Sequence, residues 1–140
     1  MKTYQATPKE VVRAWHVIDA KDKVLGQVAR DAAIFLMGKH KVTFTPHVDS
    51  GDFVIVINAD TVAVTGRKAT DKMYYSHSGI PQGFKQISFE KLMEKDSRKV
   101  ILHAVKGMLP KNKQQDPRLA RLKIFAGSEH DYQDKFVTNK

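Results

Sequence analysis

The sequence contains no cysteine among its 140 residues, which excludes disulfides, cysteine-based zinc sites, iron–sulfur clusters and thiol nucleophiles. Long apolar runs are also missing, and runs such as Phe53–Ile57 are far too short to span a bilayer. Residues 1–10 are polar and lack the apolar region of a signal peptide, and the absence of cysteine fits an intracellular protein. Acidic residues are few, 15 against 24 lysines and arginines. The net charge of +9 favours nucleic acid as the partner, with an anionic membrane surface as the rival.

Basic side chains gather in residues 105–127. Two short apolar groups, Met108-Leu109 and Leu122 to Phe125, stand at either side of a polar loop that contains two prolines. A segment that is anchored at both ends and holds cations between them suits a polyanion. The alternative is an ordinary solvated basic loop. The cations of this segment, against the single acid Asp116, are Lys106, Lys111, Lys113, Arg118, Arg121 and Lys123.

The hydrophobic pattern predicts a βαβ unit in the first half of the chain. Residues 15–20 read as a strand with Trp15 and Val17 buried, and residues 24–37 read as a helix with Asp22 as its N-cap. Gly38 is placed to end that helix in the left-handed conformation. The β-branched run Phe53–Ile57 reads as a strand buried on both faces. The order strand, helix, strand implies parallel strands with a right-handed connection.

The second half of the chain alternates short elements with loops. Ser88 can cap one helix, and Asp96 or Ser97 can cap the next, whose apolar stripe runs from Val100 to Met108. We expect one α/β domain over residues 1–140, with a polar arm at 1–14 and a polar tail at 128–140. The remaining expected elements are strands at 61–65 and 123–126, an extended segment at 72–77, and one or two helical turns at 117–122.

Motifs for nucleotide or metal chemistry are missing. The nearest approach to a phosphate-binding loop, residues 66–70, lacks the first glycine, and Gly26 stands alone after the first strand. The histidines never form an H-x-H or H-E-x-x-H pair, so we predict no metal site. Asp49 and Asp52 are candidates for paired carboxylates, although Asp52 more simply opens a strand. We therefore predict neither an enzyme nor a cofactor.

Cations instead recur beside small or flat residues at expected turns. Lysine and arginine there can contact phosphates, glycine lets an RNA backbone approach, and tyrosine or histidine can stack on an unpaired base. RNA is favoured over DNA because the sequence holds neither a recognition-helix motif nor a zipper. Neither main helix is a cationic amphipathic helix of the kind that binds membranes. The residues in question are Lys39, His40, Lys41, Arg67, Lys68, Lys72, Tyr75, His77, Lys106, Lys111 and Lys113.

In the span from Trp15 to His130 the sequence resembles the L-thirteen family of large-subunit ribosomal proteins, in its bacterial or organellar form. The last two of the matching blocks are the most specific to the family. The matching blocks are residues 15–20, 25–26, 38–41 with 45–46, 51–59, 65–68, 71–79, 104–112, 122–127 and 129–130.

The resemblance implies a single three-layer α/β/α domain with a mostly parallel sheet and extended basic loops. It implies large-subunit rRNA and neighbouring ribosomal proteins as partners, a role early in subunit assembly, a ribosome-bound cytoplasmic location, and no small-molecule substrate. By motif, the RNA contacts would be the loop residues named above. Arg118, Arg121 and Lys123 are predicted RNA contacts as well, although the family varies at these three positions. A free regulatory RNA-binding module and an RNA- or nucleotide-acting enzyme are the alternative functions.

Some positions depart from the family pattern. Gln27 stands where the family usually has arginine, so one cation is lost. Residues 81–85 replace the usual Pro-Gly-Gly-Leu-Lys, and Asp131 stands where proline is common. Residues 114–117 replace a glycine-containing link, and this loop is therefore expected to take its own path.

Overall fold

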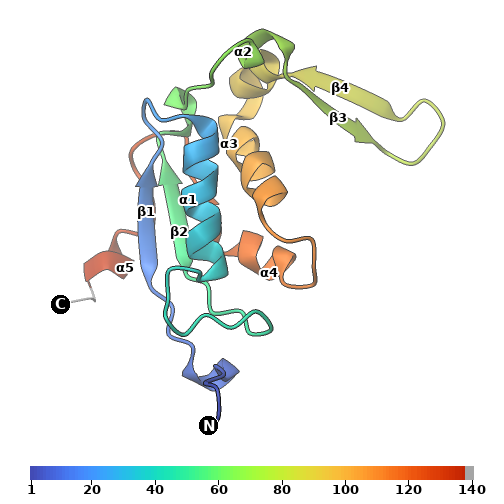
Figure 1. The fold of residues 1–140 in the computed structure, drawn as a ribbon. Helices are drawn as coiled ribbons and strands as arrows, with labels where there is room; N and C mark the ends of the chain where they lie inside the picture. The colour runs from blue at the N-terminus through green and yellow to red at the C-terminus, as the bar shows by residue number, and fades with distance from the viewer. Residues whose placement is uncertain (138–140) are drawn as a thin grey trace.

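The computed structural model describes residues 1–137, so residues 138–140 of the expected polar tail lie outside the described chain. Three parallel strands form the main sheet in the order β1 (Trp15–Asp19), β2 (Phe53–Ile57) and β5 (Leu122–Ile124), as Figure 1 shows for β1 and β2. Trp15 pairs with Phe53, and Val54 pairs with Leu122. The predicted α/β class, the parallel sheet and the buried central strand are therefore confirmed, since Val54, Ile55 and Val56 have no exposed surface.

Helix α1 (Leu25–Met37) begins and ends close to the predicted residues. Leucine, valine and alanine at three- and four-residue spacing supply its buried face, and Gly38 ends it with a φ of +79°. The predicted N-cap is wrong: Val24 occupies that position without a side-chain hydrogen bond. Asp22 lies in the preceding turn with a φ of +56°, because the chain turns sharply between β1 and α1.

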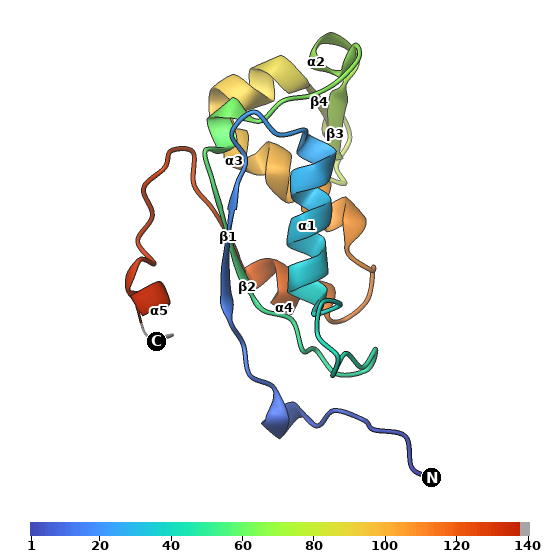
Figure 2. The ribbon, with the colours of Figure 1, turned by 60° about the vertical axis from the view of Figure 1, so that its left-hand side comes forward.

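Helix α3 (Phe89–Met108) is two helical segments joined at Asp96, whose φ of −164° and ψ of 94° interrupt the helix. Ser88 caps the first segment, accepting from the Lys91 amide, and the Asp96 carboxylate accepts from the Arg98 amide at the start of the second. Both predicted caps are thus confirmed. The buried residues of the second segment pack with those of α1 in one cluster over the sheet. Helix α4 (Gln115–Ala120) lies on this same side, as Figure 2 shows.

The opposite face of the sheet is covered by the chain that follows β5. Trp15 stacks on Phe53 with ring centroids 4.3 Å apart, and Tyr132 stacks on Trp15 at 5.2 Å. Helix α5 (Asp134–Val137) lies on that side of the sheet in Figure 2. Ile55 is covered on this face, but Val17 is 43% exposed, so the prediction that Val17 is buried is wrong. The edge position of β1 leaves Val17 uncovered.

The connection from β2 to α3 carries a second, antiparallel sheet. Strands β3 (Met73–His77) and β4 (Phe84–Ser88) form a hairpin that extends from the body of the domain (Figure 1).

The expected strand at 61–65 is wrong, because the 3₁₀ turn Ala59–Thr61 occupies its start and only Ala63 bridges to Val24. Strand β5 also begins one residue earlier than expected. The remaining short elements are the 3₁₀ turn Pro8–Glu10 and helix α2 (Lys68–Asp71). No helix within residues 1–137 combines the length and apolarity needed to cross a membrane.

Candidate nucleic-acid interface

The last turn of α3 lies between two basic recesses. On one side, Lys106, Gly107, Lys111 and Asn112 line a recess of about 460 Å³. On the other side, Lys68 and Lys72 lie beside Met108 in a recess of about 250 Å³. Among residues 1–137, no carboxylate lines either recess. We call the four lysines Lys68, Lys72, Lys106 and Lys111 the α3 band.

Other predicted contact residues lie outside the α3 band. Arg67 and Lys113 are exposed, and Tyr75 and His77 are exposed on the hairpin. Lys123 is half-buried on β5, where it pairs in register with Ile55 on the central strand. The fold thus places Lys68 and Lys72 beside Met108, in the same last turn of α3 that carries Lys106, which the sequence alone could not show.

Lys41 points into the protein. Its ammonium group lies 2.5 Å from Asp52 Oδ1, and it donates to the carbonyl oxygens of Val12 at 2.7 Å and Ser50 at 2.9 Å. An ammonium group has three donors, and these contacts use all of them. In this arrangement Lys41 joins the N-terminal arm to the loop before β2. Lys39 beside it remains exposed.

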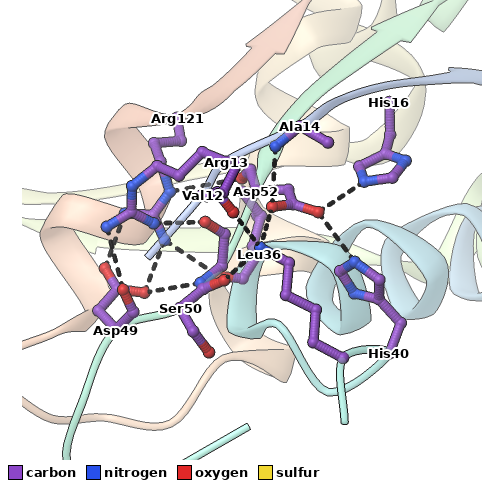
Figure 3. A network of polar contacts seen from close by, with 12 residues as sticks. Val12, Arg13, Ala14, His16, Leu36, His40, Asp49, Ser50, Asp52 and Arg121 are labelled. Atoms are coloured by element: carbon purple, nitrogen blue, oxygen red, sulfur yellow. Dashed lines mark hydrogen bonds and ion pairs between the residues drawn. The ribbon is translucent and has the colours of Figure 1, made fainter. Parts of the chain in front are cut away.

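Asp52 is the centre of this polar network and is fully buried. His16 Nε2 lies 2.7 Å and His40 Nε2 2.8 Å from Asp52 Oδ2, and the Ala14 amide donates to Oδ1 (Figure 3). Burial by itself raises the pKa of the Asp52 carboxyl, but hydrogen bonds from Lys41 and His16 outweigh it and hold the pKa below its usual range. The carboxylate is therefore held ionised at the amino ends of β1 and β2.

The types and spacing of His16, His40 and Asp52 would suit a metal ion, since their ligand atoms lie within 4.8 Å of one another. Lys41 already supplies a positive charge to the same carboxylate. Both imidazoles also pack on Phe35: the His16 ring stacks on it with centroids 4.1 Å apart, and the His40 ring meets it edge-on at 5.0 Å. The cluster is thus balanced in charge by a lysine, and the absence of a metal stays a prediction.

Arg121 and Arg118 are buried, at 8% and 3% exposure. Arg121 binds the Asp49 carboxylate at two points and also donates to the carbonyl oxygen of Leu36, at the end of α1. Arg118 Nε lies 3.5 Å from Asp49, close enough for charge attraction but without a hydrogen bond, and its Nη2 donates to Gln114. Burial raises the pKa of Asp49, but the hydrogen bond and charge of Arg121 prevail and lower it.

The role of Arg118 and Arg121 as RNA contacts stays a prediction, and the exposed cations are better placed to reach a ligand.

The sequence analysis did not single out Arg13, which donates to the carbonyl oxygens of Gly51 and Asp49. It missed Lys85, Lys95 and Lys99, which line a further recess at the hairpin. The lack of acidic residues from Lys72 to Ser88 was the available signal for Lys85.

Comparisons with known proteins agree with the sequence resemblance. Residues 13–131 match the family model described as Ribosomal protein L13. The chain is 56% identical over 133 residues to the large ribosomal subunit protein uL13 of Caldanaerobacter subterraneus, with 95% of this chain and 93% of that protein covered. It is 55% identical over 132 residues to the protein of the same name from Shewanella denitrificans, covering 94% and 93%. The chain therefore belongs to the ribosomal protein L13 family.

Proposed function

We propose that this chain is a structural constituent of the large ribosomal subunit, which binds large-subunit rRNA through its basic loops and supports an early step of assembly. The observation that carries the proposal is the α3 band, in which four lysines line two recesses free of carboxylates. Its partners are then rRNA and neighbouring ribosomal proteins in the cytoplasmic ribosome. The proposal assigns the chain no catalytic activity, no membrane and no small-molecule substrate.

Local geometry of the α3 band supports RNA in particular. A methyl group built on Gly107 would meet no atom within 4 Å, so a sugar–phosphate backbone can approach the helix closely there. The side chain of Gln115 donates to the carbonyl oxygen of Lys106, which ties α4 to the last turn of α3 and holds Lys111 near Lys106. Lys106 and Lys111 are thus presented by a fixed backbone and are both exposed.

The test is the RNA affinity of the double variant Lys106→Ala, Lys111→Ala. We expect weaker binding to large-subunit rRNA and a salt dependence that flattens by about 0.7 to 0.9 per lost phosphate contact. The matched control is Lys9→Ala, Lys91→Ala, which removes two exposed lysines outside both recesses. Equal affinity and slope in the two double variants would contradict the proposed contact.

The ribosomal role itself is tested by sedimentation. In a sucrose gradient of cell extract at high salt, the protein should travel with the large subunit and stay there. A protein that remains at the top of the gradient would contradict this role and favour the regulatory RNA-binding alternative.

A further inference from the structure

The β3–β4 hairpin carries aromatic side chains that the core does not use. Tyr75 is 65% and Phe84 57% exposed, and their rings stack at 5.9 Å with an angle of 20°. Large aromatic residues that stand in solvent side by side mark an interaction site more often than scattered single ones do. Phe84 was not among the residues singled out from the sequence.

Strand pairing separates the two faces of this hairpin. Tyr75 lies opposite Gln86, and His77 lies opposite Phe84, so these four side chains share one face. Tyr74 pairs with Ile87, and Ser76 pairs with Lys85, on the other face. Tyr74 and Ile87 pack on the core cluster, which turns that second face toward α3. The stacked aromatic pair therefore faces away from the body of the protein.

A recess of about 610 Å³ lies between β4 and α3. Its cations are Lys85 from the hairpin and Lys95 and Lys99 from the helix, and no carboxylate lines it. Within residues 1–137, none of these three lysines forms an ion pair. Phe84 lines this recess as well as stacking on Tyr75. Along β4, the flat surface of the Tyr75–Phe84 ring pair therefore adjoins a recess that is lined by lysines without acidic partners among the described residues.

We propose that β4 binds a single-stranded or bulged segment of RNA, with one unpaired base stacked on the Tyr75–Phe84 pair and the adjoining phosphates in the recess lined by Lys85, Lys95 and Lys99. Aromatic platforms next to a basic groove are the usual way in which proteins hold unpaired nucleotides. An acidic peptide would use the lysines but not the flat aromatic pair. A regular duplex would leave that pair unused, because its bases are already stacked.

This inference rests on the proposed function, since it names a second RNA subsite and the kind of RNA that fits it. The α3 band and the hairpin are separate sets of residues, so each can be altered without the other. The probes are purified large-subunit rRNA and an unstructured oligoribonucleotide that contains 2-aminopurine, whose fluorescence is quenched when it stacks on an aromatic ring.

In the full chain, Phe84→Ala and Tyr75→Ala should each weaken oligonucleotide binding at least about fivefold, with the quenching lost and the salt slope unchanged. Lys85→Ala combined with Lys99→Ala should keep the quenching and flatten the salt slope by about 0.7 per lost phosphate. Ile80→Ala is the matched apolar control, because Ile80 is 65% exposed on the same hairpin. Lys91→Ala is the cationic control, an exposed α3 lysine outside the recess. All five proteins should melt as the wild type does.

Two failures can be told apart. In the first, the Lys106→Ala, Lys111→Ala variant loses rRNA affinity, but Phe84→Ala and Tyr75→Ala bind both probes like the wild type. The proposed RNA-binding function then holds, and the hairpin is not an RNA site. If the wild type binds neither probe, the proposed RNA-binding function fails, and this inference fails with it. Equal affinity for the oligonucleotide and for its duplex would also overturn the preference for unpaired bases.

Discussion

Arg121 and Asp49 form a two-point ion pair, with Nη1 2.7 Å from Oδ2 and Nη2 2.8 Å from Oδ1. The same guanidinium donates at 3.0 Å to the carbonyl oxygen of Leu36, which belongs to the last turn of α1. One side chain therefore fastens the start of β5 to the end of α1 and to the loop before β2. A cation at the carboxyl end of a helix is also favoured by the helix dipole.

Arg121→Met should destabilise the fold by about 3 kcal/mol, because it leaves the Asp49 charge half-buried without its main partner. Urea unfolding measures this loss. Arg121→Lys is the matched control and should recover part of the stability, since lysine keeps the charge but not the two-point geometry. Once folded, both variants should keep the wild-type salt slope for rRNA binding. A flatter slope at unchanged stability would instead make Arg121 an RNA contact.

The sequence predicted the elements that local patterns determine. The β-branched run of β2, the spacing of apolar residues in α1 and the caps Ser88 and Asp96 are all local signals, and each is confirmed. Strand β4 was missed because Phe-Lys-Gln-Ile-Ser has neither a β-branched run nor strict alternation, and its pairing partner is supplied by β3.

The polar network was missed for a different reason. Asp49 and Arg121 are separated by 72 positions, and no local pattern distinguishes an arginine that turns inward from one that reaches solvent. Within the basic segment 105–127, Lys106 and Lys111 are exposed, whereas Arg118 and Arg121 are buried. Charge counting therefore located the basic segment but could not say which of its cations hold the fold together.

Acid should destabilise the protein through Asp52 and Asp49. Both carboxyls have a folded-state pKa below the ordinary value of about 3.9. The stability that they add is therefore fully present above that ordinary value and is lost as the pH falls through the folded pKa. The midpoint of urea unfolding, followed from about pH 6 to about pH 3, should decrease accordingly.

Asp52→Asn should be less stable than the wild type at neutral pH and should show a shallower loss in acid, because one of the two linked groups has been removed. Asp116→Asn is the control, since Asp116 is exposed and forms no ion pair with any described residue. It should follow the wild-type profile. An Asp52→Asn profile parallel to that of the wild type would refute the linkage.

Gly51→Ala should prevent stable folding. A methyl group built on Gly51 would lie 1.7 Å from the carbonyl oxygen of Leu36, a backbone atom that cannot move without disturbing the end of α1. Gly26→Ala is the matched control, because its methyl group would meet no atom within 4 Å in the first turn of α1. Alanine should stabilise that helix by up to about 1 kcal/mol. Thermal melting separates the two variants, and a normal melt for Gly51→Ala would contradict the close approach.

Chelation should leave the melting temperature unchanged. Lys41 already neutralises Asp52, so the cluster with His16 and His40 needs no metal for its charge balance. Melting with EDTA, and then with added Zn²⁺, tests this expectation. A rise in melting temperature with Zn²⁺ that disappears in His16→Gln would show instead that the three side chains bind a metal and displace the lysine.

Ile55→Asp and Val17→Asp together test how far one face of the sheet, the face that carries the Trp15–Phe53 pair, is covered. The two residues are direct partners in the β1–β2 register and point to the same face, yet Ile55 has no exposed surface while Val17 is 43% exposed. An aspartate at residue 55 would be buried without a partner and should unfold the domain, whereas one at residue 17 can reach water and should cost little. Circular dichroism with thermal melting distinguishes them. If both variants melted like the wild type, the chain after β5 would not cover Ile55 on the central strand β2, because an aspartate there would then reach water as one on the edge strand β1 does.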